Sequence, residues 1–202
     1  MQNIILTELK EGRKMANILI DELPKKVGNI DINSDFRISI LFELLMQDNE
    51  LSSEEKVEQA LVLYYPNLTA ITDYSKAIED IVWFYRCGKE VNTNDKGSIK
   101  NSNKQIYSYE FDAEYIYSAF MEQYNIDLNS IKYLHWWKFK ALFNSLNENV
   151  LFSKIMSYRV IDLSKIKDKA IKKQYKQLKE LYKLPDMRSE EEKENDFAEA
   201  FS

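Results

Sequence analysis

The sequence predicts an all-α fold: a single helical domain of about seven or eight helices, with a short extended or hairpin segment near the N-terminus. The 202 residues include only 4 Gly and 3 Pro, where average usage gives about 14 and about 10. Tight β-hairpins depend on such residues, so a turn-rich β-sandwich is disfavoured. Apolar residues also recur at helical spacing between Ser, Asp and Asn residues that can cap helices.

Composition excludes several classes of protein. With 45% hydrophobic and 13% aromatic residues, the chain can build a sizeable core and is too apolar to be wholly disordered. A net charge of -5 gives no overall electrostatic footprint for nucleic acid. The single cysteine, Cys87, cannot form an internal disulfide. No apolar run approaches the roughly 18 residues of a membrane span, so we expect a soluble, intracellular protein without a membrane partner.

The first 14 residues differ in character from the rest of the chain. Lys10–Met15 can be encoded by a purine-rich stretch that resembles a bacterial ribosome-binding site. We therefore expect synthesis to begin at Met15 and residues 1–14 to be a leader or a disordered extension; the alternative is a genuine N-terminal extension. Further along, Ile30 and Ile32 alternate with polar residues, which predicts the short extended segment or hairpin.

Three helices are predicted in an N-terminal helical half, residues 15–88. The first carries apolar residues at helical spacing, namely Phe36, Ile40, Leu41, Leu44 and Leu45. The expected N-caps are Ser34, Ser52 and Asp73. Ser52 and Glu55 have the spacing of a capping box. Pro66 is expected to stop the second helix or to lie just past it, and Gly88 to end the third as its C-cap.

Residues 89–106 are polar and rich in Asn and Ser. Because so long a structureless stretch is unusual inside a compact domain, we interpret it as a flexible polar linker between the two helical halves. Directly after it, Tyr107, Tyr109 and Phe111 alternate, which indicates a short extended entry to the second half.

The C-terminal helical half, residues 107–184, contains the densest aromatic cluster, between Leu128 and Leu146. One helical face there is predicted to carry Trp136, Phe139, Phe143 and Leu146. Trp136 and Trp137 are about 100° apart on a helix, so we expect one of them to lie at an interface. The candidate partner-binding residues of this region are Trp136, Trp137 and Phe139.

Further helices complete this half. Asp112 is expected to cap the helix before the aromatic cluster, residues 147–149 to provide the cap of a helix over Val150 to Tyr158, and Ser164 to cap the last helix. That last helix has a clean apolar stripe of Ile171, Tyr175, Leu178 and Tyr182. Pro185 marks its end.

Charge is unevenly divided near the C-terminus. Residues 165–183 hold eight lysines against Asp168 and Glu180, whereas residues 186–202 hold two basic and seven acidic residues. The lysines are interpreted as a solvated helix face rather than a nucleic-acid site. The acidic tail, residues 185–202, carries the remaining candidate partner-binding residues, Phe197 and Phe201. Such a segment either folds on binding a partner or stays solvated.

No constellation for catalysis, metal binding or cofactor binding stands out. The only histidine, His135, is best explained as a partly buried, hydrogen-bonded residue of the aromatic cluster. One His and one Cys cannot complete a zinc quartet, and four scattered glycines form neither a P-loop nor a dinucleotide fingerprint. We therefore predict no catalytic residue, no cofactor and no metal, and a function that is not enzymatic.

Several motifs together resemble a family of bacteriophage tail-region proteins, found in long-tailed phages and prophages of Gram-positive hosts. The segments that carry the resemblance are Asp35-Phe36-Arg37, Phe111–Phe120, Tyr124–Leu128, Leu134-His-Trp-Trp-Lys-Phe139, Ile155, Tyr158-Arg159 and the lysine-rich helix through Tyr182. The resemblance runs from about Met15 to about Leu184. The His-Trp-Trp-x-Phe segment is its most distinctive part.

The resemblance implies a small helical tail assembly chaperone that acts in the host bacterial cytoplasm. Such a chaperone is thought to bind the tape-measure protein and keep it soluble until the tail tube protein polymerises around it. The acidic tail is expected to contact tail tube protein or other copies of the chain, with no role for nucleic acid or membrane. The alternative is a structural component of the tail or baseplate, which would remain in purified mature particles, whereas a chaperone would be absent.

Overall fold

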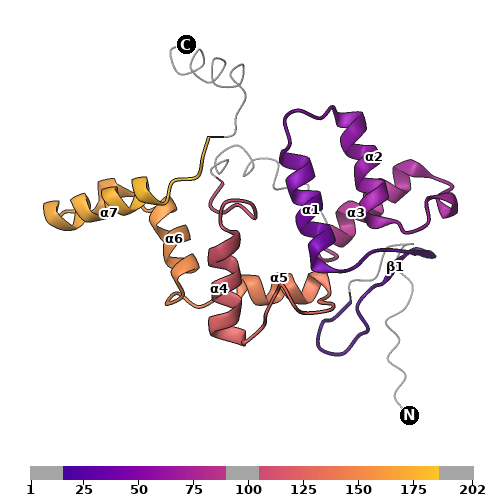
Figure 1. The fold of residues 1–202 in the computed structure, drawn as a ribbon, viewed down its shortest axis with the longest axis horizontal. Helices are drawn as coiled ribbons and strands as arrows, with labels where there is room; N and C mark the ends of the chain where they lie inside the picture. The colour runs from indigo at the N-terminus through magenta and orange to yellow at the C-terminus, as the bar shows by residue number, and fades with distance from the viewer. Residues whose placement is uncertain (1–15, 90–104, 187–202) are drawn as a thin grey trace.

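The computed structural model describes residues 16–89 and 105–186. Within these ranges the chain forms seven α-helices and a small N-terminal hairpin, which confirms the predicted fold class (Figure 1). The helices are α1 (Phe36–Gln47), α2 (Ser53–Tyr64), α3 (Tyr74–Tyr85), α4 (Ala113–Tyr124), α5 (Trp136–Asn144), α6 (Leu151–Val160) and α7 (Lys169–Leu181). The short 3-10 turns η1 (Leu68–Ala70) and η4 (Leu163–Lys165) precede α3 and α7.

The expected leader (1–14), most of the expected linker (89–106) and most of the expected acidic tail (185–202) lie outside the described residues. The same holds for Phe197 and Phe201.

The hairpin pairs β1 (Lys26–Val27) with β2 (Ile30–Asp31) in antiparallel register, with Val27 opposite Ile30. Gly28 forms the turn at φ +61°, a left-handed conformation that glycine adopts without a Cβ clash. Val27 is buried and Ile30 is partly buried against the core, so both strands of the hairpin contribute an apolar anchor. The alternation of Ile30 and Ile32 thus indicated the correct local structure.

Two predicted caps are confirmed. Ser52 Oγ accepts the Glu55 backbone N–H at 3.3 Å, and Glu55 Oε2 accepts the Ser52 N–H at 2.8 Å, which completes the capping box. Asp73 Oδ1 accepts the Lys76 N–H at 3.0 Å. These bonds satisfy N–H groups that have no partner inside the helix. The second helix also ends at Tyr64, before Pro66, as predicted.

The cap of α1 is Asp35 and not Ser34 as predicted. Asp35 Oδ1 accepts the Arg37 N–H at 3.1 Å. The Ser34 hydroxyl is instead hydrogen-bonded to Tyr133 Oη at 2.8 Å. The Ser34 hydroxyl is therefore used in a long-range contact and not in the capping bond that the local sequence predicted.

Two later caps are also displaced. The last helix is capped by Asp168, whose Oδ1 accepts the Ala170 N–H at 2.8 Å, while Ser164 lies earlier, in η4. The cap expected within residues 147–149 is instead Val150, which makes no side-chain capping bond. Asp162 provides the local acceptor for η4, so the chain turns once before the helix begins.

The end of α3 uses Cys87 and Gly88 together. Arg86 is the C-cap, Cys87 follows at φ +57° and Gly88 at φ +75°. Gly88 donates its N–H to Trp83 O at 3.0 Å, and Cys87 donates to Phe84 O at 2.9 Å, the bond pattern of a Schellman motif. Gly88 was correctly placed at the helix end, but the left-handed position directly after the cap belongs to Cys87.

α5 is shorter than the aromatic helix expected over residues 131–146, because the backbone before Trp136 forms hydrogen bonds with another segment. Phe36 donates its N–H to Leu134 O at 2.9 Å, and Trp136 donates to Ser34 O at 2.8 Å. Asp35 Oδ2 accepts the Leu134 N–H at 3.1 Å. This bridge between residues 34–36 and 134–136 delays the helix until Trp136, and Leu146 lies beyond its end.

The extended entry predicted at Tyr107, Tyr109 and Phe111 is a turn. Ser108 Oγ accepts the backbone N–H groups of Glu110 and Phe111, at 3.2 and 3.3 Å. A serine hydroxyl in this position favours a turn over an extended strand. Tyr109 is buried and Phe111 is exposed, so the two rings do not share one face as they would in a strand.

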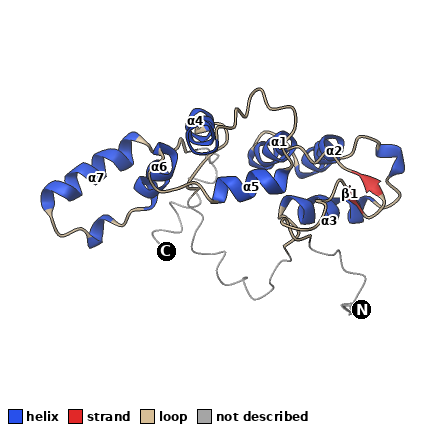
Figure 2. Ribbon diagram, turned by 90° about the horizontal axis from the view of Figure 1, so that it is seen from below, coloured by secondary structure: helices blue, strands red, loops and turns tan. Residues whose placement is uncertain are grey.

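The seven helices form an elongated body with α5 near its middle. Figures 1 and 2 show α1, α2 and α3 on one side of α5, and α4, α6 and α7 on the other, with α7 at the far end. Buried side chains from both sides of α5 belong to one continuous hydrophobic core. The two helical halves therefore share a core despite the break between them in sequence.

A stack of three phenylalanines joins the two sides. Phe139 of α5 lies between Phe36 of α1, at a centroid distance of 4.8 Å, and Phe120 of α4, at 5.0 Å. The interplanar angles are 14° and 10°. Phe139 and Phe120 are fully buried and Phe36 nearly so.

We expect Phe139→Ala to lower the free energy of unfolding by about 3–5 kcal/mol, the typical cost of removing a buried phenylalanine ring. The matched change Phe111→Ala removes an exposed ring and should cost much less. Chemical denaturation followed by circular dichroism measures both. Equal losses for the two variants would show that the stack does not join the halves.

Candidate partner-binding groove

The sequence-predicted candidates on α5 are core residues. Trp136 and Phe139 are 0% exposed and Trp137 is 4% exposed. The expectation that one of the two tryptophans faces outward is therefore wrong. Their surroundings explain why both rings point inward.

Both indoles cap the C-terminus of α3. Trp136 Nε1 donates to Tyr85 O at 2.8 Å, and Trp137 Nε1 donates to Phe84 O at 2.8 Å. The last carbonyls of a helix have no intrahelical partner, and a buried indole N–H needs an acceptor, so each group satisfies the other. Trp136 also stacks on Tyr85, with ring centroids 5.5 Å apart. The two adjacent tryptophans reach neighbouring carbonyls of one helix end.

His135 is the N-cap of α5, in agreement with the structural role expected for it. Its Nδ1 accepts the Trp137 N–H at 3.1 Å, and Nε2 lies 3.0 Å from Pro24 O. The neutral ring with hydrogen on Nε2 satisfies both contacts. Burial lowers the pKa of His135 below its ordinary value of 6.5, against the opposing effect of the Pro24 hydrogen bond, with small further lowering by Lys138 and Lys25.

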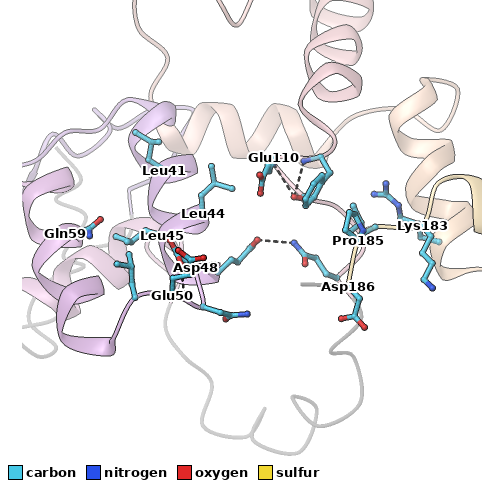
Figure 3. Close-up of a pocket in the computed structure, with 18 of the residues that line it drawn as sticks. Leu41, Leu44, Leu45, Asp48, Glu50, Gln59, Glu110, Lys183, Pro185 and Asp186 are labelled. Atoms are coloured by element: carbon cyan, nitrogen blue, oxygen red, sulfur yellow. Dashed lines mark hydrogen bonds between the residues drawn. The ribbon is translucent and has the colours of Figure 1, made fainter. Parts of the chain in front are cut away.

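The described surface contains an open groove of about 2000 Å³. Figure 3 shows Leu41, Leu44 and Leu45 on one side of it and Lys183 and Pro185 on the other. Its walls thus come from α1 and α2 at one end of the sequence and from α7 and the residues just after it at the other.

The wall formed by α1 and α2 is apolar at its centre. Leu41, Leu44 and Leu45 follow helical spacing on α1, and Val62 and Leu63 face the groove from α2. Leu41 is 47% exposed and Val62 is 62% exposed. The rim of this wall is acidic, with Asp48, Glu50 and Glu58.

The opposite wall is basic. Lys176, Lys179 and Lys183 of the α7 region line it. Lys179 Nζ donates to Ile161 O at 2.7 Å, which holds this part of α7 against the residues after α6. The groove is therefore unevenly charged: Asp48, Glu50 and Glu58 line one rim, whereas on the other wall the three lysines outnumber two acidic residues, Glu180 and Asp186.

A buried ion pair positions the basic wall. Arg159 of α6 forms a two-pronged contact with Asp112, with N···O distances of 2.6 and 2.8 Å, and the two side chains are 7% and 1% exposed. Arg159 Nε also donates to Tyr182 O at 2.6 Å, and Nη1 donates to Ile106 O at 3.0 Å. Asp112 was correctly predicted to precede α4, but its carboxylate makes no capping bond and serves this pair instead.

The family model described as Bacteriophage Gp15 protein matches residues 8–184. The chain belongs to the bacteriophage Gp15 protein family. The phage resemblance drawn from the motifs is thereby confirmed at the level of the family, and the match begins at residue 8 rather than at Met15. No curated protein and no solved structure matches the chain.

The motifs that carried the resemblance have clear structural roles in this Gp15-family chain. Asp35-Phe36-Arg37 joins the N-terminal side to the backbone before α5: Arg37 Nη2 donates to Leu128 O at 2.9 Å and to Ile131 O at 2.7 Å. The Tyr158-Arg159 pair holds α7, since Tyr158 stacks on Tyr182 with centroids 6.0 Å apart. These motifs fix the relative positions of the groove walls.

The sequence missed the groove because its walls are far apart in the chain. A signal was nevertheless present in α1, which has apolar residues on more than one face. Phe42 and Leu45 enter the core, whereas Leu41 remains half exposed. An apolar residue beyond what one buried face needs points to a second contact surface.

Other kinds of site are not apparent in residues 16–89 and 105–186. No group of three or more His, Cys, Asp or Glu residues there is arranged to hold a metal ion. Over the same residues, no helix has both the length and the apolar character needed to cross a bilayer.

The neutral state of buried His135 predicts a pH dependence. Because its pKa is lowered in the folded chain, the unfolded chain binds the proton first, and stability should fall as pH drops below about 6.5, by at most about 1.4 kcal/mol per pH unit. His135→Asn keeps a capping acceptor but cannot titrate. Denaturation curves between pH 5 and 8 should show a weaker acid destabilisation for this variant, and identical curves would contradict the assignment.

Removing one partner of the buried pair should be costly. We expect Arg159→Met to lower the free energy of unfolding by about 3–5 kcal/mol, because Asp112 is left buried and unpaired. Adding Asp112→Leu should recover most of that loss, and Arg86→Met, at an exposed arginine, should be nearly neutral. Urea denaturation of the four proteins tests this, and a double variant no more stable than Arg159→Met would refute it.

Proposed function

We propose that the chain is a non-enzymatic phage tail assembly chaperone. It binds the tape-measure protein in the host bacterial cytoplasm and keeps it soluble while the tail tube assembles. The observation that carries this proposal is the open groove with exposed apolar side chains between α1, α2 and α7, in a chain of the bacteriophage Gp15 family.

The size of the groove favours a polypeptide as its occupant. Pockets for small molecules usually measure about 300–1,000 Å³ and enclose most of their ligand. This groove, at about 2000 Å³, is larger and is bounded by separate helices on either side. A helix laid along it could contact both walls at once.

The apolar wall matches the chemistry of such a helix. Leu41, Leu44 and Leu45 form an i, i+3, i+4 ridge, with Val62 beside it. Helix-in-groove recognition uses apolar anchors with this spacing on both partners. A long helical protein that exposes apolar surface aggregates when alone, and covering that surface is what the proposed chaperone does.

The unequal charge of the two rims favours one orientation of a helix bound in the groove. Asp48 and Glu50 favour basic side chains on one flank of the bound helix, and Lys176 and Lys183 favour acidic side chains on the other. Complementary charge of this kind sets the direction of binding and discriminates against wrong partners more than it adds affinity. We therefore expect the bound segment of the tape-measure protein to carry opposite charges on its two flanks.

Charged residues placed in the apolar wall should weaken binding of the tape-measure protein. We expect Leu41→Asp with Val62→Asp to weaken binding to the tape-measure protein at least tenfold, since burial of each side chain contributes about 1.5–3 kcal/mol. The readout is the soluble fraction of tape-measure protein on co-expression, followed by co-purification.

A matched control lies on the same two helices. Met46 and Val57 are 39% and 40% exposed and do not line the groove. Met46→Asp with Val57→Asp adds the same charges and should leave co-purification intact. The proposal fails if the tape-measure protein is no more soluble with the unaltered chain than without it.

A further inference from the structure

We propose that the acidic C-terminal segment, residues 187–202, docks in the groove of its own chain and must be displaced by any helix that binds there. The docking itself is independent of the proposed function. Only the identity of the displacing partner, the tape-measure protein, rests on that function.

The segment starts inside the groove. Leu184, Pro185 and Asp186 line it, next to Lys183 (Figure 3). Sixteen residues follow Asp186. Phe197 is the eleventh of them, and eleven residues reach up to about 36–40 Å when extended. The segment is therefore long enough to run along the basic wall and return to the apolar one.

Charge complementarity indicates that the acidic run lies along the lysines of the α7 wall. Residues 187–202 contain six acidic residues and two basic ones, and the first acidic cluster, Glu190–Glu194, comes soon after Asp186. The adjacent wall carries Lys176, Lys179 and Lys183. Asp48, Glu50 and Glu58 on the far rim repel the same cluster, so the acidic run is expected to follow α7.

The apolar wall fits the end of the segment. Phe197 and Phe201 are four residues apart, so a helical turn places both rings on one face. Leu41, Leu44 and Val62 offer apolar surface in the same groove. An acidic stretch followed by two aromatic anchors is a composition that orders on contact with such a surface.

The covalent tether makes even weak docking effective. A short tether gives an effective concentration of about millimolar, so a site with a dissociation constant of about 0.1 mM is roughly nine-tenths occupied. A competing helix then binds about tenfold more weakly than it binds to the empty groove. The segment thus acts as an internal competitor that only a well-matched partner displaces.

Zero-length carbodiimide cross-linking of the full chain, without any partner, tests the docking. The reagent joins carboxylates to lysines that are in contact. We expect cross-links from Glu190–Glu194 to Lys176 or Lys183, identified by mass spectrometry, and at least a fivefold decrease in 1 M salt, where screening acts within about 3 Å. Lys132 and Lys138, exposed and outside the groove, are the internal control.

Two variants isolate the apolar anchors. Phe197→Ala with Phe201→Ala leaves every cross-linking group in place and should reduce the yield at least threefold. Ser189→Ala with Asn195→Ala alters the same segment without removing the rings and should leave the yield unchanged. Mixing isotopically heavy and light protein separates contacts within one chain from contacts between copies.

Several outcomes would overturn the proposal: no cross-links to the groove lysines, equal yields to Lys132 and Lys138, or cross-links only between heavy and light chains. In a separate assay, Phe197→Ala with Phe201→Ala should strengthen binding of the tape-measure protein about tenfold. If cross-linking succeeds but no tape-measure protein binds to any variant, the docking stands and the proposed function fails.

Discussion

Phe139 is the ring on which the two sides of the molecule pack. Its stack with Phe36 and Phe120 joins α1 to α4 through α5, and the backbone bridge between residues 34–36 and 134–136 lies beside it. The groove has one wall on the α1 side and the other on the α7 side, so its width depends on this junction. Aromatic contacts in the core thereby determine the distance between the two walls of the groove.

Long-range hydrogen bonds add to the phenylalanine stack in fixing the relative positions of the helices. The indoles of Trp136 and Trp137 satisfy the carbonyl end of α3, and Arg159 reaches Asp112, Ile106 and Tyr182 at once. Buried donors and acceptors are costly when unpaired. These bonds therefore favour one relative placement of the helices, whereas burial of apolar area alone would tolerate several.

Local chemistry was predictable where the deciding contacts are themselves local. The Ser52–Glu55 capping box and the Asp73 cap depend on groups three residues away, and the sequence places them correctly. Ser34 and Asp112 failed as capping side chains because distant residues, Tyr133 and Arg159, claim them. One of Trp136 and Trp137 was expected at an interface, because helix periodicity cannot reveal that both indole N–H groups find carbonyl acceptors on α3. The groove escaped prediction for the same reason, since its walls are far apart in the chain.

Because the two walls of the groove are far apart in the chain, they are synthesised at different times. Chains are made from the N-terminus, and structure forms as segments emerge. The apolar wall, which includes Leu41 and Val62, is synthesised more than a hundred residues before Lys176 and Lys183 of the basic wall. A groove with both walls therefore exists only after Lys183 has been synthesised, so a helix that needs both walls has no complete site before that point.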